Sequence, residues 1–245
     1  MDFTLYVVFH KFLVPECYET LSPEDMKHLR FMAVNAKIPK EIPENLRTLV
    51  IAERNLPWYD PFLQHNRFCE SSAFFHVWKN PPLMNDYIGF FHYDMLIERP
   101  AIEFLQQQIK ALGGERVVFT NVTLTARPHI EQVLELSEWN QIIQLYNGIF
   151  GKSHTIFSIL DEELPMYHSF VVHRDTFERM MFFAEKAIPY LFELIGFDTK
   201  HLPFMIERLH GVFLALQRLD GAVRWIPLPG ITHLDRLKDS WRSPA

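Results

Sequence analysis

The chain has few cysteines, no excess of positive charge and no long apolar run. Its two cysteines, Cys17 and Cys69, are too few for a disulfide-rich scaffold or a cysteine-ligated zinc site. Lys and Arg number 24 against 30 Asp and Glu, which gives a net charge of −6. We therefore expect no general nucleic-acid binding, because that activity needs a basic face to neutralise phosphates. A single nucleotide needs only a few local cations and stays compatible with this composition.

Signals for a membrane or for secretion are also missing. No segment approaches the ~20 apolar residues of a transmembrane helix. The N-terminal stretch MDFTLYVVFH has no basic leader, and its apolar run is too short for a secretory signal. Together with the scarcity of cysteine, these absences predict a reduced, cytoplasmic setting.

Several common catalytic fingerprints are absent as well. No glycine-rich turn follows the first apolar run, Phe3–Phe9, so neither a P-loop nor a dinucleotide-binding turn is indicated. The sequence has no G-x-S-x-G nucleophile elbow and no pair of histidines at helical spacing beside a glutamate.

The chain does contain enough apolar material for one large core. Of its 245 residues, 48% are hydrophobic and 14% are aromatic. Apolar runs predict strands at Phe3–Phe9, Leu46–Ala52, Asp86–Tyr93, Arg116–Thr120, His168–Val172 and Val223–Leu228. Helices are predicted to start after Ser22 and to cover Arg67–Asn80, Ala101–Leu112, Ile130–Phe150, Arg174–Leu194 and Pro203–Gln217. This alternation favours an α/β fold with a mainly parallel sheet and helices on both faces.

Three segments carry residues that oppose regular structure. Asn147-Gly148 is expected to interrupt one helix, and Pro189 is expected to kink or break another. The polar, proline-containing stretch Asn55–Asn66 is expected to be a loop.

The strand Asp86–Tyr93 ends in polar residues that suit a ligand site. An apolar run gives way to His92, Tyr93 and Asp94 at the carboxyl end of a strand, where open α/β sheets bind ligands. His92 and Asp94 are two residues apart, so on an extended backbone they point to the same side. Such a pair can bind Mg²⁺ or Mn²⁺ that bridges a diphosphate. The alternative is a structural histidine beside a solvated aspartate.

Two blocks of sequence resemble a known family. Residues 66–80, NRFCESSAFFHVWKN, and residues 86–93, DYIGFFHY, resemble bacterial capsular-polysaccharide glycosyltransferase-like domains, which carry an "sE-x-x-x-x-y-W-x-W-K-N" helix followed by "D-Y-I-G-l-x-H-Y-R-R". Three further segments agree in order: residues 6–11, 166–172 and 206–209. The resemblance implies a GT-A-type nucleotide-diphospho-sugar transferase.

That resemblance sets the expected domain and activity. It implies a single domain over residues 1–245, with a donor-binding half at about 1–125 and an acceptor-side half at about 126–245. The enzyme would be a hexosyl- or pentosyltransferase of polysaccharide biosynthesis. It would move a sugar from a nucleoside-diphosphate sugar, with UDP-sugar favoured, to a glycan acceptor.

One departure from the family pattern concerns the metal. Where the family has Arg-Arg after His-Tyr, this chain has Asp94-Met95. Arginine can neutralise a diphosphate without a metal, whereas aspartate repels it. His92-Tyr93-Asp94 resembles the D-x-D signature of metal-dependent GT-A enzymes. The resemblance therefore implies Mn²⁺ or Mg²⁺ bound by Asp94, with His92 and His233 as further ligands; a contact between Asp94 and ribose is the alternative.

The remaining candidates follow from position and from the resemblance. His10 and Lys11 end the first strand, where they would meet the donor, or they form a surface pair. Glu70 would orient the helix beside the donor, or it is a carboxylate stabilised by the helix dipole. Tyr93 is the last of the residues expected to bind the nucleotide-sugar donor, together with His92 and Asp94. Tyr167 and His168 are assigned to the acceptor side.

A base is needed only if transfer inverts the configuration of the sugar. The candidates are Glu207 and Asp161. Glu207 is alternatively one half of an internal pair with Arg208, and Asp161 belongs to an acidic loop that is alternatively a solvated surface. Two other functions stay open: a metal-dependent phosphohydrolase, which needs more clustered Asp and His, and a non-catalytic nucleotide- or sugar-binding module.

Overall fold

The centre of the protein is one seven-stranded sheet. The computed structural model describes residues 1–10, 13–34, 42–65, 67–195 and 201–234. In spatial order the strands are β10 (Arg224–Pro227), β6 (Val117–Thr120), β9 (Phe170–His173), β4 (Tyr87–His92), β1 (Phe3–Phe9), β2 (Leu29–Ala33) and β3 (Val50–Ala52). All neighbours pair in parallel except β9, which is antiparallel to both β4 and β6. The predicted α/β class with a mainly parallel sheet is confirmed.

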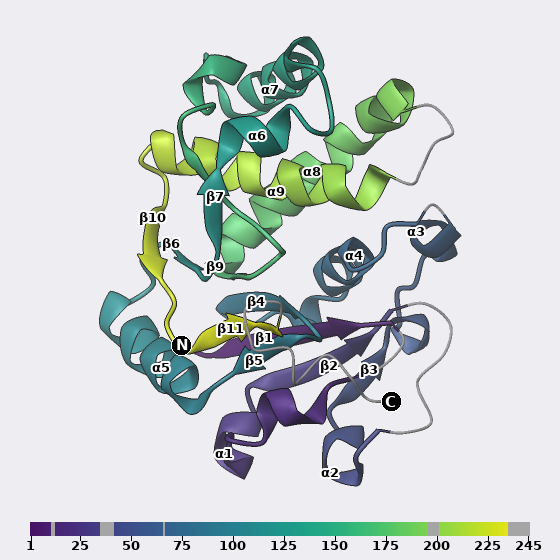
Figure 1. Cartoon of the computed structure of the whole chain (residues 1–245), viewed down its shortest axis with the longest axis vertical. Coiled ribbons are helices and arrows are strands. Elements are labelled where there is room, and N and C mark those ends of the chain that lie inside the picture. The colour runs from purple at the N-terminus through teal and green to yellow at the C-terminus, as the bar shows by residue number, and fades with distance from the viewer. Residues whose placement is uncertain (11–12, 35–41, 66, 196–200, 235–245) are drawn as a thin grey trace.

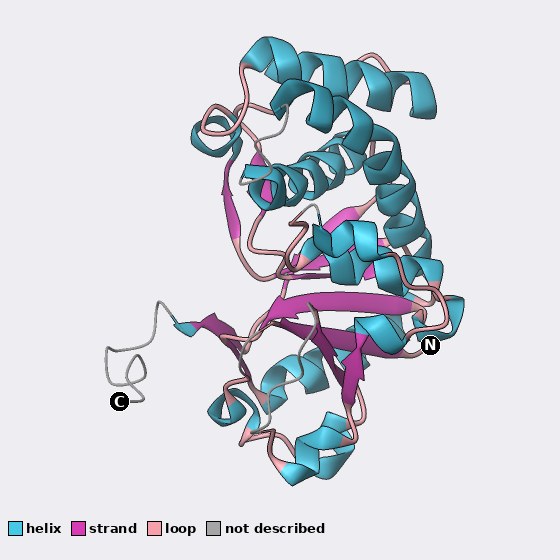
Figure 2. Ribbon diagram, turned by 90° about the vertical axis from the view of Figure 1, so that its right-hand side faces the viewer, coloured by secondary structure: helices cyan, strands magenta, loops and turns pink. Residues whose placement is uncertain are grey.

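Helices cover both faces of the sheet (Figures 1 and 2). One face carries α4 (Ser71–Lys79), α7 (Leu136–Phe150), α8 (Arg174–Ile195) and α9 (Leu202–Leu219), and the other carries α1 (Pro23–Met26), α2 (Glu44–Arg47) and α5 (Arg99–Leu112). Along β1, apolar side chains point to both faces of the sheet, so both faces must be covered by helices. Tyr6 and Val8 join the first apolar core, whereas Leu5 and Val7 join the second.

Short elements complete the described part of the chain. They are the helices α3 (Pro61–His65) and α6 (Ala126–Ile130) and the 3₁₀ turns η1 (Pro15–Tyr18), η2 (Glu53–Asn55), η3 (Pro81–Leu83) and η4 (Ile156–Ser158). Two small antiparallel ladders join β5 (Met95–Ile97) to β11 (Ile231–His233) and β7 (Thr123–Thr125) to β8 (Glu163–Pro165). Within the described ranges, no helix is long and apolar enough to cross a membrane.

Local end signals in the sequence match the structure. Ser22 caps α1, where its hydroxyl accepts the N–H of Asp25 and the carboxylate of Asp25 accepts the N–H of Ser22. The helix α5 ends at Gly113, which adopts a left-handed conformation with φ of 58°.

Other sequence predictions were wrong. β2 was not predicted, because a five-residue apolar run beside a helix start does not distinguish a strand from a helix. The predicted strand Leu46–Ala52 begins inside α2, and only Val50–Ala52 pairs in the sheet. The stretch expected to be a loop, Asn55–Asn66, contains α3.

Neither of the two helices expected to be interrupted is broken at the expected residue. The helix α7 continues through Gly148, and α8 continues through Pro189. Ala187 and Leu191 on either side of that proline are buried in the core, so tertiary packing supports the helix there. The predicted helix Ile130–Phe150 is instead divided earlier, between α6 and α7.

The two halves of the chain interleave in the sheet. β9 lies between β4 and β6, which precede it by a long stretch of sequence, and β10 extends the sheet beyond β6. Residues from both halves therefore meet at the same sheet edge.

Two helical glycines offer a matched test of packing. A Cβ on Gly211 of α9 would lie 2.9 Å from the carbonyl oxygen of Pro165 on β8, whereas a Cβ on Gly148 of α7 would meet nothing within 4 Å. We expect Gly211→Ala to lower the free energy of unfolding by about 1–3 kcal/mol through overpacking. Gly148→Ala should raise it by roughly 0.5–1 kcal/mol through helix propensity. Urea denaturation of both variants measures this; equal effects would contradict the close approach of α9 to β8.

Candidate active site

Polar residues from three adjacent strands meet at one edge of the sheet. β1 and β4 are parallel, with Val8 opposite His92, so His10 and His92 lie at the same carboxyl edge. Because β9 runs in the opposite direction, the residues before it, Tyr167 and His168, lie at this edge too. The rings of His92 and His168 have centroids 6.2 Å apart. The strand directions thus collect residues that are far apart in sequence.

A small ladder places His233 beside Asp94. After β4 the chain turns at Tyr93-Asp94 into β5, which pairs with β11 so that His233 lies opposite Met95. The N–H of Leu234 donates to the carbonyl of Asp94 at 2.9 Å. The distance between His233 Nε2 and Asp94 Oδ2 is 3.4 Å. His233 therefore lies in a strand, and Asp94 reaches the site from a turn instead of from the extended strand.

The donor-side candidates form a second group next to this pair. His10 Nδ1 lies 3.8 Å from Glu70 Oε1, and the His10 ring meets the edge of the Tyr93 ring at a centroid distance of 6.1 Å. Glu70 occupies the N-cap position of α4, yet its side chain forms no capping hydrogen bond. Its carboxylate faces His10 instead. Lys11 lies outside the described residues.

The acceptor-side candidates adopt an unusual backbone. Tyr167 and His168 have φ of 57° and 46°, and two consecutive non-glycine residues in the left-handed region are strained. The Tyr167 ring packs against the ring of His233, with centroids 5.6 Å apart. Such strain persists only where surrounding contacts hold it, and it is concentrated at functional sites.

Helix α9 holds this strained turn. The carboxylate of Glu207 accepts the backbone N–H of Tyr167, and His168 Nε2 lies 3.2 Å from His210 Nδ1. Glu207 also receives a hydrogen bond from Arg208 at 2.9 Å, so the internal Glu–Arg pair weighed as an alternative is present. Burial raises the pKa of Glu207, while the positive charge of Arg208 acts in the opposite direction.

Asp161 is not part of this group. It is 93% exposed and lies 3.7 Å from Arg127. In the described part of the chain, no contact links it to the residues at the sheet edge. Asp161 therefore lies where the alternative places it, in an acidic loop on the solvated surface.

The sheet edge leaves two buried polar atoms unsatisfied. His92 Nε2 and Asp94 Oδ1 have no hydrogen-bond partner among the described residues. Burial lowers the pKa of His92, while the charges of Glu70 and Asp94 act to raise it. Buried polar groups in proteins are normally hydrogen-bonded, so two orphaned atoms at one edge fit a site whose ligand completes the bonding.

These residues fit a cation only in part. Among the described residues, no group of three Asp, Glu, His or Cys side chains is arranged to hold a metal ion. However, Mg²⁺ commonly uses one or two carboxylates together with substrate phosphates. The unpartnered oxygen of Asp94, with His233 beside its other oxygen, fits such a shared site.

Residue His210 was missed by sequence reasoning, although a signal was present. Glu207 and His210 are three residues apart in a predicted helix, which places both on one face. Both are buried, and both contact the turn at Tyr167-His168. The ring of Phe74 packs against His168 and His210, with centroids at 4.5 Å and 5.0 Å.

Comparison with known proteins supports the fold. No protein-family model matches the chain, and no curated protein matches it. Among solved structures, the chain is similar to an apo structure of WbbM, described as a bifunctional glycosyltransferase, with a TM-score of 0.63 and 15% sequence identity. The match covers 95% of this chain and 45% of that one, so this chain spans less than half the length of that protein. The chain has a glycosyltransferase-like fold; the assignment to the capsular-polysaccharide family stays a prediction.

The buried Glu207 offers a test of the strained turn. Its side chain and that of Arg208 are 11% and 9% exposed, whereas Glu178 and Arg174 form an exposed pair on α8. We expect Glu207→Ala to lower the free energy of unfolding by about 3–5 kcal/mol, because a buried charge loses its partner. The control Glu178→Ala should cost about 1 kcal/mol or less. Chemical denaturation measures both, and similar losses would contradict the role of Glu207.

The buried His210 predicts acid sensitivity. Burial lowers its pKa from 6.5 to about 3, so below pH 6.5 the unfolded chain takes up a proton that the folded chain does not. Above pH 6.5 both states are neutral at this group and it contributes nothing. The free energy of unfolding should fall by up to about 1.4 kcal/mol per pH unit between these values. His210→Phe should be less stable at pH 7, and its free energy of unfolding should fall less steeply than that of the wild type as the pH is lowered. Denaturation curves at several pH values measure this, and equal slopes for the two proteins would disprove it.

Proposed function

We propose that this protein transfers a glycosyl group from a nucleoside-diphosphate sugar to a glycan acceptor. The observation that carries the proposal is the convergence of Asp94, His92 and His233 at the carboxyl edge of the sheet, with two buried polar atoms unsatisfied. A glycosyltransferase-like fold with this arrangement at its ligand-binding edge supports sugar transfer over the other functions weighed.

The donor would bind across the ends of β1 and β4. His10, Glu70 and Tyr93 lie together there, and an aromatic ring at this position suits a base or sugar. UDP-sugar is the favoured donor because UDP is common among enzymes of the GT-A type that the sequence resembles. Tyr167, which is 36% exposed beside His233, would face the acceptor, and His168, which is buried, would support that turn.

The chemistry requires compensation of the charge that develops on the departing diphosphate. Asp94 repels that charge by itself, so we propose that Asp94 and His233, with His92 next to them, hold Mn²⁺ or Mg²⁺. The cation would supply electrostatic stabilisation of the leaving group. The ladder between β5 and β11 orients Asp94 and His233 before any ligand binds.

If transfer inverts configuration, Glu207 is the better placed of the two candidate bases. Its carboxylate binds the backbone N–H of Tyr167, and burial raises its pKa, which makes it a stronger base than an exposed carboxylate. Asp161 points into solvent beside Arg127. We therefore propose Glu207 for this role.

Binding and turnover experiments separate these functions. Calorimetry with UDP- and GDP-sugars, with and without Mn²⁺, should show donor binding that the cation strengthens. Asp94→Asn should reduce donor turnover by about 10²–10³-fold, the effect of losing one group that acts on a developing charge. The control Asp86→Asn, at the opposite end of the same strand, should keep wild-type turnover, because its carboxylate binds the backbone nitrogen of Asp2 and lies near the N-terminus, away from the site.

Each rival predicts a different result. A binding module would bind the donor without turnover, and a phosphohydrolase would release phosphate without sugar transfer. Absence of donor binding, or full turnover by Asp94→Asn, would refute the proposal.

A further inference from the structure

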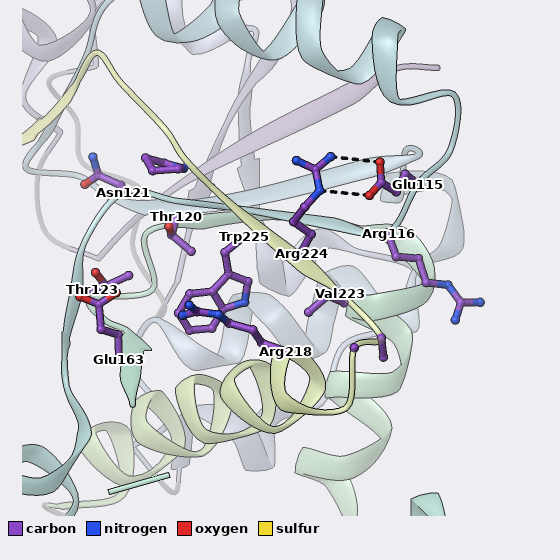
Figure 3. Close-up of a pocket in the computed structure, with 13 residues that line it drawn as sticks. Glu115, Arg116, Thr120, Asn121, Thr123, Glu163, Arg218, Val223, Arg224 and Trp225 are labelled. Atoms are coloured by element: carbon purple, nitrogen blue, oxygen red, sulfur yellow. Dashed lines mark hydrogen bonds and ion pairs between the residues drawn. The ribbon is translucent and has the colours of Figure 1, made fainter. Parts of the chain in front are cut away.

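A second surface feature lies along the β10 edge of the sheet. It is a groove of about 820 Å³ between β10, β6, the β7–β8 ladder and the end of α9 (Figure 3). A volume of this size suits a ligand of several rings. The residues used below line it: Glu115, Arg116, Thr120, Asn121, Thr123, Glu163, Arg218, Arg224 and Trp225.

At one end of the groove, the charged side chains form ion pairs with each other or with a neighbouring residue. Arg224 donates two hydrogen bonds to Glu115, both at 3.1 Å, and Figure 3 shows this pair at the end opposite Asn121 and Glu163. Arg116 pairs with Asp175 at 3.0 Å. These ion pairs leave no net charge at this end for a ligand to satisfy.

The Trp225 ring and Arg218 lie in the middle of the groove, and Glu163 lies towards the end that holds Asn121 (Figure 3). The guanidinium of Arg218 lies 4.6 Å from the centre of the Trp225 ring. Among the described residues, neither Arg218 nor Glu163 forms an ion pair, and Trp225 Nε1 has no hydrogen-bond partner. The side chains of Arg218 and Glu163 are both exposed to the groove and carry opposite charges, so the lining favours a ligand without net charge.

The other end leads to the candidate active site. The carbonyl of Thr120 accepts the N–H of Leu228 at 2.8 Å, and Asn121 Nδ2 donates to the carbonyl of Ile231 at 2.8 Å. Ile231 begins β11, which ends at His233 beside Asp94. The N–H of Asn121 also donates to the carbonyl of Ser169, next to the strained turn. Asn121 thus belongs to the groove and also supports the strands that carry the candidate site.

The lining matches an uncharged saccharide. Sugar hydroxyls both donate and accept hydrogen bonds, and the groove offers hydroxyls from Thr120 and Thr123, an amide, a carboxylate and a guanidinium. The apolar faces of sugar rings pack against flat groups such as the stacked Arg218 and Trp225. Arg224 and Arg116 are paired with Glu115 and Asp175, and Glu163 offsets Arg218, so the lining lacks the basic excess that a nucleic-acid strand needs. An apolar ligand would leave these polar groups desolvated.

We propose that this groove binds the glycan acceptor as an extended, uncharged oligosaccharide whose reacting end points along Asn121 towards His233 and Asp94. The assignment rests on the proposed function, because it names the acceptor site of that reaction. It extends acceptor recognition from Tyr167, which the sequence indicated, to residues along the β10 edge of the sheet.

Nuclear magnetic resonance tests the groove directly. The ¹⁵N-labelled protein is titrated with cello-, malto-, manno- and chito-tetraose. At least one should shift the indole N–H signal of Trp225, identified by its loss in Trp225→Phe. The signal of Trp139, whose indole N–H donates to Ile130 in the core, should stay in place.

Variants link the shift to the groove residues. Arg218→Gln and Glu163→Gln should each weaken tetrasaccharide binding by about tenfold, a loss comparable to one charge-assisted hydrogen bond. The matched controls Arg47→Gln and Glu44→Gln disrupt an exposed pair on α2, across the sheet, and should bind as the wild type does. No shift of Trp225 by any of the four sugars, or wild-type binding by both groove variants, would overturn the proposal.

The same samples distinguish this failure from failure of the proposed function. Donor binding by the wild-type protein is measured in parallel with UDP- and GDP-sugars. Donor binding without any effect at Trp225 would reject the groove alone. Absence of both would reject the proposed function together with its acceptor site.

Discussion

β9 runs against its two neighbours in an otherwise parallel sheet, and its hydrogen bonds to β4 and β6 position the rest of the site. Reversal of one strand brings the residues just before it, Tyr167 and His168, to the edge where β1 and β4 finish. The same strand lies between elements from the first half of the chain, so the ladder cannot form until distant segments have met. The candidate active site is therefore a product of sheet pairing as much as of any local motif.

Around that edge the protein maintains features that cost stability. Two left-handed residues, a buried Glu207–Arg208 pair and the neutral histidines His168 and His210 are all unfavourable in isolation. They persist because α9 is anchored across the sheet, with Gly211 allowing close contact with β8. The large apolar core beneath α4, α8 and α9 supplies the stability that offsets them. This local loss of stability is typical of a binding site whose geometry is preorganised before a ligand binds.

Much of the fold could be predicted where a pattern was long and strongly periodic. β1, β4, α5 and α9 appear close to their expected bounds, because strand alternation or helical spacing is continuous in each. The pattern failed for β2, whose five residues depend on pairing with β1 and β3. It failed also at Gly148 and Pro189, where packing outweighs local propensity. Most candidate site residues meet in space, yet the reason for the position of His233 came from the β5–β11 register.

The sequence alone determined which polar side chains stand at the ends of β1 and β4, since an apolar run that stops at His10 or at His92 is a local pattern. Only the tertiary structure decided that His233 lies beside Asp94, that Glu207 binds the backbone of Tyr167, and that Asp161 stays apart. The physical reason is that these contacts join segments distant in the chain. The register of the paired strands depends on burial of both sheet faces and on the hydrogen bonds between strands. Neither can be predicted from a short stretch of sequence.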